Sequence, residues 1–427
     1  MVSTPWKNSS HPSLVSIGKG PAPTFESADG QYSLTISGRV HADFAVYDQD
    51  PVATGAQDAR VDPDLNSGSL IRRGRLGVEG KIAGDWVYEL FLDLGSANSR
   101  LYSAYMAYKG IKPLTIAIGK HKAPTGMEEM TSSNDITFLE RSLPSNVATD
   151  VGASRRLGLS VQANGDAWYA GVGVFGTDDN VEVMDEQIGV NGRVAVVPWR
   201  NDDALIHVGA SGYYLFMPDQ NNAANEFNFT DRPEIRVDGT RWISGASPAI
   251  FSNDNAWLYA AELAGKYGPF WTQAEYFGFG MNQSRDPAGD GTGEPDLDFE
   301  GFYAQAGYIL TGESRNYVNT RKTFGTVTPA NPFSLSAGGW GAWELAVRFS
   351  YVDLDDHANS FDPTTGLLVG SRGGVEQNWT AAVNWYVNNY VLFKFNYINV
   401  DVDRLSAAGL QSGDNFDVYA LRAQVKW

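Results

Sequence analysis

The sequence of 427 residues contains no cysteine and only five histidines. The absence of cysteine excludes disulfides, thiol catalysis and cysteine-ligated zinc together. The histidines are scattered along the chain, which argues against a histidine-rich metal site. We therefore expect no metal and no cofactor.

Long apolar runs are also missing. No stretch approaches the roughly 20 apolar residues that a transmembrane helix needs. Residues 1–7 lack a basic segment followed by an apolar core, and we interpret them as a mature or re-engineered start whose secretion signal has gone. A membrane barrel stays compatible with this composition, because its strands need only roughly 9–11 residues, every second one apolar.

Positive charge is scarce, since 32 Lys and Arg stand against 50 Asp and Glu and the formal net charge is -18. Phosphate binding needs a basic face, so this balance argues against nucleic acid as a partner. It also argues against a peripheral protein held on anionic lipid.

Signatures of enzymes are absent as well: the chain has no GxSxG elbow, P-loop or HExxH helix. Ser37, His41 and Asp43 share one face of a predicted strand. We interpret them as ordinary polar lumen residues and not as a catalytic triad, and we expect that the chain is not an enzyme.

What the sequence has is an alternation of apolar and polar residues with period two. Between residues 32 and 47, Leu34 and Phe44 belong to an apolar face and Arg39 to a polar one. The alternation holds for some fifteen positions, beyond the 4–8 that a soluble strand usually shows. Residues 415–427 alternate in the same way and end on a tryptophan, which is typical of an outer-membrane β-barrel.

Sixteen segments share this pattern, and bacterial single-chain barrels have even strand counts. We therefore predict an all-β fold: a 16-stranded antiparallel transmembrane β-barrel over residues 32–427, preceded by an irregular N-terminal arm over residues 1–31. The predicted strands are 32–47, 70–82, 86–96, 102–110, 113–121, 156–163, 168–176, 187–198, 204–216, 256–266, 270–278, 299–312, 342–352, 377–388, 390–400 and 415–427.

Connection lengths support the same fold. Tight turns of Gly, Asn, Asp and Pro alternate with long connections around most of the chain, as expected for a barrel with short periplasmic turns and long external loops. Aromatic side chains near the strand ends, such as Trp86, Trp168 and Tyr259, alternate in step with the apolar residues of their strands. They predict aromatic belts at the two water–lipid boundaries.

The polar parity places charges of both signs in the lumen. Such a set suits a water-filled pore, in which separated bases and acids would orient a dipolar or ionic solute; alternatively, the charges neutralise each other as structural pairs. The predicted lumen bases are Arg39, Arg73, Arg75, Lys81, Arg156, Arg193, Arg348, Lys394, Arg422 and Lys426, and the acids are Asp43, Glu79, Glu89, Asp93, Glu262, Glu275 and Glu344.

Basic clusters at strand starts and in the long connections predict anion contacts, because guanidinium groups bind oxyanions and rings of Arg or Lys select anions in a pore. These clusters contain Arg72, Arg73, Arg75, Lys120, Lys122, Arg232, Arg236, Arg241, Arg315, Arg321 and Lys322. We expect them, with Arg39, to line the pore or bind anions.

Several blocks of the chain, in this order, resemble the phosphate-selective porin O/P family of outer-membrane porins. The resemblance extends from about Tyr32 to Trp427. The blocks are Ser37–Asp43, Ile71–Gly77, Ile118–Lys120, Thr131–Arg141, Gln273–Tyr276, Gly301–Glu313, Gly341–Leu345 and Val383–Tyr386.

The resemblance implies a sixteen-stranded trimeric porin with loops folded into the channel. In the phosphate-specific members an arginine ladder leads to a central group of lysines. Here the positions similar to that ladder hold Arg72, Arg73, Arg141, Arg232, Arg236 and Arg241.

The centre departs from the family pattern. Glu128 and Glu129 stand where a lysine is expected, and a second expected lysine is replaced near Val318, with Arg321 and Lys322 nearby as substitutes. A carboxylate at the constriction repels phosphate by roughly 4 kcal/mol at about 4 Å and an effective dielectric near 20. The family resemblance therefore does not by itself predict phosphate transport.

We predict a porin of the Gram-negative outer membrane that passes small hydrophilic solutes passively, prefers anions, and contacts outer-membrane lipid and lipopolysaccharide as a homotrimer. Alternatives left open are a general or weakly cation-preferring porin, because of Glu128 and Glu129, and a non-conducting barrel with a structural or partner-binding role. The solutes expected are small and anionic or neutral.

Overall fold

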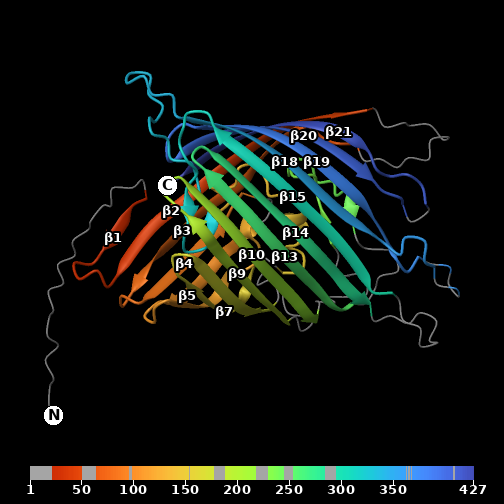
Figure 1. Cartoon of the computed structure of the whole chain (residues 1–427), viewed down its shortest axis with the longest axis horizontal. Helices are drawn as coiled ribbons and strands as arrows, with labels where there is room; N and C mark the ends of the chain where they lie inside the picture. The colour runs from red at the N-terminus through yellow and green to blue at the C-terminus, as the bar shows by residue number, and fades with distance from the viewer. Residues whose placement is uncertain are drawn as a thin grey trace, which may run out of the picture.

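Sixteen long strands form a closed antiparallel barrel in the computed structural model (Figure 1). The first of them, β2 (Ser33–Gln49), pairs with both the second and the last, which closes the sheet. The predicted fold class is confirmed. The other barrel strands are β3 (Gly68–Ile82), β4 (Trp86–Asp93), β5 (Arg100–Tyr108), β6 (Leu114–Lys122), β7 (Arg155–Asn164), β8 (Trp168–Phe175), β9 (Ile188–Arg200), β10 (Ala204–Met217), β13 (Asn253–Tyr267), β14 (Phe270–Gln283), β15 (Leu297–Ile309), β18 (Ala342–Asp356), β19 (Ser371–Tyr386), β20 (Val391–Asp403) and β21 (Asn415–Lys426).

The structure describes residues 22–50, 64–95, 99–152, 154–176, 188–217, 229–244, 253–283, 295–361, 363, 366, 368–406 and 409–427. Most of the predicted arm, residues 1–21, lies outside these ranges; its remainder contains β1 (Thr24–Glu26), which pairs with β2. Among the described residues no helix has the length and apolar composition needed to cross a membrane. The short elements are β11 (Thr230–Asp231), β12 (Ile243–Ser244), β16 (Tyr317–Val318), β17 (Thr323–Phe324), α1 (Met127–Met130) and α2 (Leu143–Val147).

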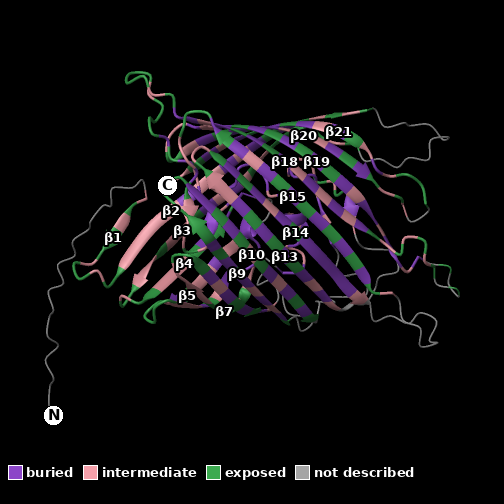
Figure 2. Cartoon of the chain, in the orientation of Figure 1, coloured by how far each residue is buried: buried purple, intermediate pink, exposed green. Residues whose placement is uncertain are grey.

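Each barrel strand has one buried and one exposed face, and the two alternate residue by residue (Figure 2). On β2, His41 and Asp43 point inward and are fully buried, whereas Phe44 and Val46 point outward and are 50% and 57% exposed. Successive side chains of a strand lie on opposite sides of the sheet, so the apolar parity forms the outer surface. This arrangement, with apolar side chains outside, is the one that lipid requires.

Aromatic rings gather on the outer surface near both ends of the strands. Trp257 and Tyr259 stack with centroids 5.7 Å apart on β13, and Trp86 and Tyr108 lie 5.0 Å apart on β4 and β5. Such amphipathic rings are favoured where the hydrocarbon meets the headgroups.

The connections differ at the two ends of the barrel, which we call the loop end and the turn end. At the turn end, residues 83–85, 165–167, 201–203 and 268–269 form tight turns, whereas the loop end carries the long connections of residues 123–154 and 218–252. Short turns are periplasmic in outer-membrane barrels and long loops are external.

One long connection departs from the predicted alternation. Residues 310–341, between β15 and β18, lie at the turn end among the tight turns. The sequence pattern shows that this connection is long. Whether it lies at the turn end or at the loop end can be inferred only if every strand before it has been identified correctly. We call residues 310–341 the turn-end insert.

Leu263 tests the lipid-facing assignment. It is 59% exposed on the outer face of β13, midway between Tyr259 and Tyr267. We expect Leu263→Arg to lower the free energy of unfolding from lipid vesicles by about 2–4 kcal/mol, because an arginine near the bilayer midplane is poorly solvated. Denaturant titration measures this loss, with Leu263→Ala as the control for side-chain size; equal effects of the two variants would contradict a lipid-facing position.

Candidate pore and its inward loops

The connection after β6, residues 123–154, folds into the barrel and is fixed by one carboxylate. Glu140 is buried and accepts hydrogen bonds from Arg72 Nε at 2.8 Å, Arg73 Nη2 at 3.0 Å and Arg422 Nη2 at 2.8 Å. Burial alone would raise the pKa of Glu140, but the three guanidinium groups outweigh it and hold this pKa well below its usual value. Arg422 also donates to Asp43 at 2.6 Å, so the cations have two acidic partners.

Backbone carbonyls of the same loop accept hydrogen bonds from the opposite wall. Lys394 Nζ on β20 donates to the carbonyls of Ile136 and Phe138, and Asn384 on β19 donates to the carbonyl of Thr137 at 3.0 Å. The loop backbone thus accepts hydrogen bonds from polar side chains of the wall, which would otherwise lack partners in an interior without water.

Two further carboxylates fix the two short helices of this loop. Glu275 on β14 accepts hydrogen bonds from the backbone N–H groups of Met127 at 2.6 Å and Glu128 at 2.8 Å, at the start of α1. Glu234 accepts from the backbone N–H of Leu143 at 2.8 Å, at the start of α2, and from Arg348 Nε at 3.0 Å.

Glu234 belongs to a second segment inside the barrel, residues 229–244, which contains β11 and β12. Its apolar residues Phe229 and Trp242 pack with Leu143 and Val147 of α2 and with inward side chains such as Phe279. The lumen along β13–β21 is therefore filled by loops and is a packed core.

The turn-end insert enters from the other mouth. Arg315 donates to the hydroxyl of Thr137 and lies 3.7 Å from Glu344, and Arg193 donates to the carbonyls of Arg321 and Lys322. The lumen is thus narrowed from both ends.

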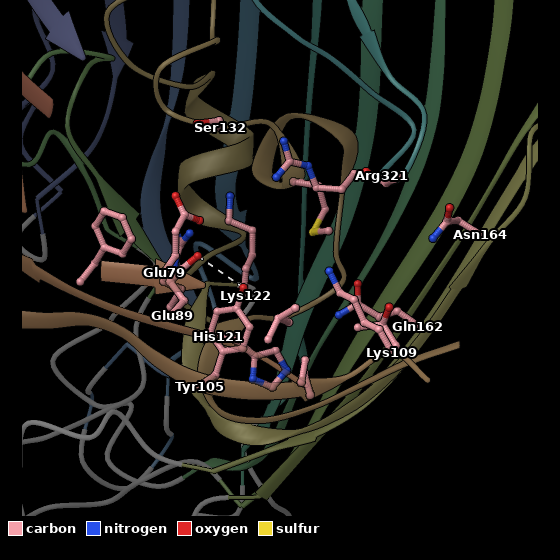
Figure 3. A pocket seen from close by; sticks show the side chains of 18 of the residues that line it. Glu79, Glu89, Tyr105, Lys109, His121, Lys122, Ser132, Gln162, Asn164 and Arg321 are labelled. Atoms are coloured by element: carbon pink, nitrogen blue, oxygen red, sulfur yellow. Dashed lines mark hydrogen bonds between the residues drawn. The ribbon is translucent and has the colours of Figure 1, made fainter. Parts of the chain in front are cut away.

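A cavity of about 720 Å³ remains on the side that the loops leave open, along β2–β8 (Figure 3). The cationic residues of its lining are Arg39, Lys109, Lys112, Lys122, Arg155 and Arg321, and the acidic ones are Glu79 and Glu89. Figure 3 shows Glu79 and Glu89 on one side of the cavity and Lys109 and Arg321 on the other.

An aromatic ring organises the cations at the level of Arg39. The guanidinium carbons of Arg75 and Arg155 lie 3.4 Å and 3.9 Å from the centroid of the Tyr102 ring. Arg39 donates to the hydroxyl of Ser133 on the inward loop at 3.0 Å. Cation–π contacts hold the guanidinium planes in place without neutralising their charge.

The predicted anion-binding cations divide into two groups. Arg39 and Arg321 line the cavity, and Arg75 lies beside it on Tyr102 while it donates to Asp93 at 2.7 Å. Most of the others pair with acids: Arg72 and Arg73 with Glu140, Arg141 with Glu129 and Arg236 with Asp231 of the inward segments, and Arg315 with Glu344 of the wall strand β18.

The remaining predicted cations are placed elsewhere. Arg241 donates to the carbonyl of Thr230 at 3.1 Å, and Arg232 lies on the same inward segment. Lys120 is buried on β6 and is not part of the cavity lining.

Lys322 does not line the cavity either. Its ammonium donates to the carbonyls of Gly165 at 2.7 Å and Asp166 at 3.0 Å and to Asn319, which ties the turn-end insert to the β7–β8 turn. Burial lowers the pKa of Lys322 to about 8.

Glu128 and Glu129, predicted as constriction acids, are both buried and both occupied. Glu128 accepts from the Ser142 hydroxyl at 2.7 Å, and burial raises its pKa. Glu129 pairs with Arg141 at 3.0 Å and Lys122 at 3.3 Å; although burial opposes it, the attraction of these cations lowers the pKa of Glu129. Neither carboxylate presents an unpaired charge to the cavity.

The predicted site omits Arg155, whereas Lys122 belongs to the predicted basic cluster at Lys120. They are opposite each other in the β6–β7 ladder, at the strand ends beside the inward loop. The period-two pattern predicts that Arg156 points into the lumen and Arg155 to the outside. Arg155 nevertheless lines the cavity, because the regular alternation does not extend to this first residue of β7. In the sequence, the one feature that points to Arg155 is its place beside Arg156 in a basic pair.

A closed sixteen-stranded barrel with an apolar aromatic-belted exterior, a charged interior and loops folded into its lumen defines an outer-membrane porin. Residues 34–427 match the family model described as phosphate-selective porin O and P, and the chain belongs to that family.

Comparisons with individual proteins agree with this assignment. The chain is 27% identical over 414 residues to Porin O of Pseudomonas aeruginosa, covering 91% of this chain and 87% of that protein. It is 28% identical over 408 residues to an uncharacterized protein of Caulobacter vibrioides, covering 92% and 73%. Among solved structures, an anion-selective porin from Comamonas acidovorans superposes with a TM-score of 0.53 at 12% identity, covering 93% and 100%, and shares the fold.

Glu140→Gln tests the anchoring of the inward loop. The amide cannot neutralise the three guanidinium groups, and breaking a buried ion pair on one side costs about 3–5 kcal/mol. We expect protease cleavage within residues 123–154 of the folded barrel, which the native protein resists, and a larger single-channel conductance. Glu26→Gln, at an exposed pair with Lys81, is the matched control and leaves both unchanged.

The same pair predicts a pH dependence. Because the pKa of Glu140 is depressed in the folded state, its contribution to stability is complete above the unfolded value of about 4.5 and is lost as pH falls through the lower folded value. Conductance at pH 5 should therefore equal that at pH 7, with loop release only in stronger acid. A rise in conductance already between pH 7 and 5 would contradict this assignment.

Proposed function

We propose that this porin prefers anions, phosphate-type anions among them, and passes small hydrophilic solutes through the cavity along β2–β8 by passive diffusion. Solutes that enter at the loop end meet Arg39, Arg155 and Lys122 beside the inward loop and then Lys109 and Arg321 near the turn end.

One observation carries this proposal: two cavity arginines keep their charge. Among the described residues, no carboxylate pairs with Arg39 or Arg155; Arg39 bonds to a serine hydroxyl and Arg155 lies on an aromatic face. Unpaired guanidinium groups in a water-filled constriction attract anions and raise their local concentration. The acids that would cancel this field, Glu129 and Glu140, pair with other cations.

A general or weakly cation-preferring porin is the second candidate, and a different observation favours it. Glu79 and Glu89 are opposite each other across β3 and β4 and both line the cavity. From the residues that the structure describes, they accept hydrogen bonds only from hydroxyl groups, those of Ser37 and Ser103 at 3.1 Å and 2.5 Å and of Tyr105 at 3.4 Å. The net selectivity depends on whether this pair or the arginines dominate the narrowest section.

We also propose a homotrimer whose outer face contacts lipid and lipopolysaccharide. Membership in the porin O and P family supports this assembly, and the exposed apolar parity of the strands supports the lipid contact. Light scattering of the detergent-solubilised protein measures the mass of the assembly against the monomer mass of 46.5 kDa.

The proposal includes no catalytic activity. Ser37, His41 and Asp43 each have a different partner: Ser37 donates to Glu79, His41 lies 3.2 Å from Asn134 and Asp43 binds Arg422. No hydrogen bond joins the three, so they do not support a nucleophilic relay.

The reversal potential across a KCl gradient in a planar bilayer tests the anion preference. We expect an anion-selective sign and a decrease of chloride current when phosphate is added. Arg155→Gln should lower the chloride-to-potassium permeability ratio by up to about thirtyfold, because one unit charge at about 4 Å in water changes the energies of the anion and of the cation by about 1 kcal/mol each, in opposite directions.

Arg241→Gln is the matched control, because Arg241 is an exposed member of the predicted cluster away from the cavity lining, and its ratio should stay unchanged. A cation-selective native channel that becomes anion-selective in the Glu79→Gln/Glu89→Gln variant would establish the second candidate. A native protein that gives no current would favour the non-conducting barrel.

A further inference from the structure

The turn-end insert carries an exposed apolar hairpin, residues 331–341, at the tip of a connection that projects from the turn end (Figure 1). Leu335 is 91% exposed and Trp340 is 73% exposed, and the projecting segment is mostly exposed in Figure 2. Residues 323–343 contain no Asp, Glu, Lys, Arg or His, in a chain whose charged residues make up 19% of the total. A stretch this apolar and this uncharged is not built to face water.

Hydrogen bonds within the hairpin define its turn. Ser334 N–H donates to the carbonyl of Gly339 at 3.0 Å, and Gly338 N–H donates to the carbonyl of Ser334 at 2.9 Å. Gly338 has a φ of 74°, in the left-handed region that favours glycine and closes the turn.

Two indole groups of the barrel hold the hairpin at a fixed position. Trp343 Nε1 and Trp385 Nε1 both donate to the carbonyl of Trp340, at 3.2 Å and 2.9 Å. Phe333 N–H donates to the carbonyl of Val387 in the β19–β20 turn at 2.8 Å. The side chain of Trp340 is thereby directed outward while its carbonyl is tied to the strands.

The apolar surface of the hairpin continues the aromatic belt of the barrel. Phe333 meets Trp385 edge to face at 5.2 Å, and Trp385 stacks between Trp343 at 5.4 Å and Phe393 at 5.7 Å. Trp343, Trp385 and Phe393 lie on the outward parity of β18, β19 and β20. The hairpin is therefore continuous with the surface that already faces lipid at the turn end.

We propose that residues 331–341 form a membrane wedge: Leu335 and Trp340 enter the boundary between headgroups and acyl chains of the periplasmic leaflet. The partner is a phospholipid surface, contacted without electrostatic attraction. Continuity with the lipid-facing belt and the uncharged run favour lipid over a second copy of the chain or a periplasmic partner.

The absence of cysteine allows a direct test, because a single introduced thiol is the only labelling site. A nitroxide attached to Leu335→Cys in phosphatidylethanolamine–phosphatidylglycerol vesicles reports collisions with oxygen, which concentrates in lipid, and with a water-soluble nickel chelate. Leu263→Cys is the lipid control, and Asp202→Cys, exposed in the β9–β10 turn at the same end, is the water control.

We expect the oxygen-to-nickel collision ratio of the Leu335 label to lie between those of the two controls and several-fold above that of the water control. Trp340→Ala, which keeps the carbonyl that the indoles bind, should shift the label toward the water value. A native label that matches Asp202→Cys would overturn the proposal. Dipolar broadening between Leu335 labels that vanishes on dilution with unlabelled protein would overturn it in favour of a second copy.

Discussion

A barrel of sixteen strands encloses more space than its own inward side chains can fill, and the rest of this structure depends on how that space is occupied. Loops occupy the side along β13–β21, and they allow several charges of the wall to be buried because they supply oppositely charged partners. Glu140 with Arg72, Arg73 and Arg422, and Glu234 with Arg348, are the two central examples. The open cavity along β2–β8 is what this packing leaves free.

This division of the lumen reconciles the acidic net charge with an arginine-lined passage. The carboxylates of the inward segments lie within the packed half and neutralise the arginines of the wall and loops. Arg39 and Arg155 face the open half with a hydroxyl and an aromatic ring as neighbours, so they keep their charge. The sign of the field in the cavity therefore follows from pairing, and the formal charge of the chain does not determine it.

The sequence predicts the barrel closely because the strands, their inward and outward faces and the aromatic belts all depend on residues that are close together in the sequence. Period two identifies the sixteen strands and places Asp43, Glu262 and Arg348 inward, where the structure has them.

The site is less predictable, because its contacts join residues far apart in the sequence: the partners of Glu140 lie more than 60 positions away in each direction. The alternation also predicts the wrong face at some strand ends, as at Arg155. Residue type alone does not reveal that Lys322 joins two connections. The roles assigned to Arg72, Arg141 and Glu129 in anion passage stay predictions.

The long connection at the turn end has an electrical consequence. It brings Arg321 to the same side of the cavity as Lys109, whereas Glu79 and Glu89, three residues from the β3–β4 turn at the same end of the barrel, lie on the other side. Fixed charges of opposite sign on facing walls set up an electric field across the passage. A zwitterion lowers its energy in such a field by lying across the pore, so the channel distinguishes solutes by the separation of their charges as well as by their net charge.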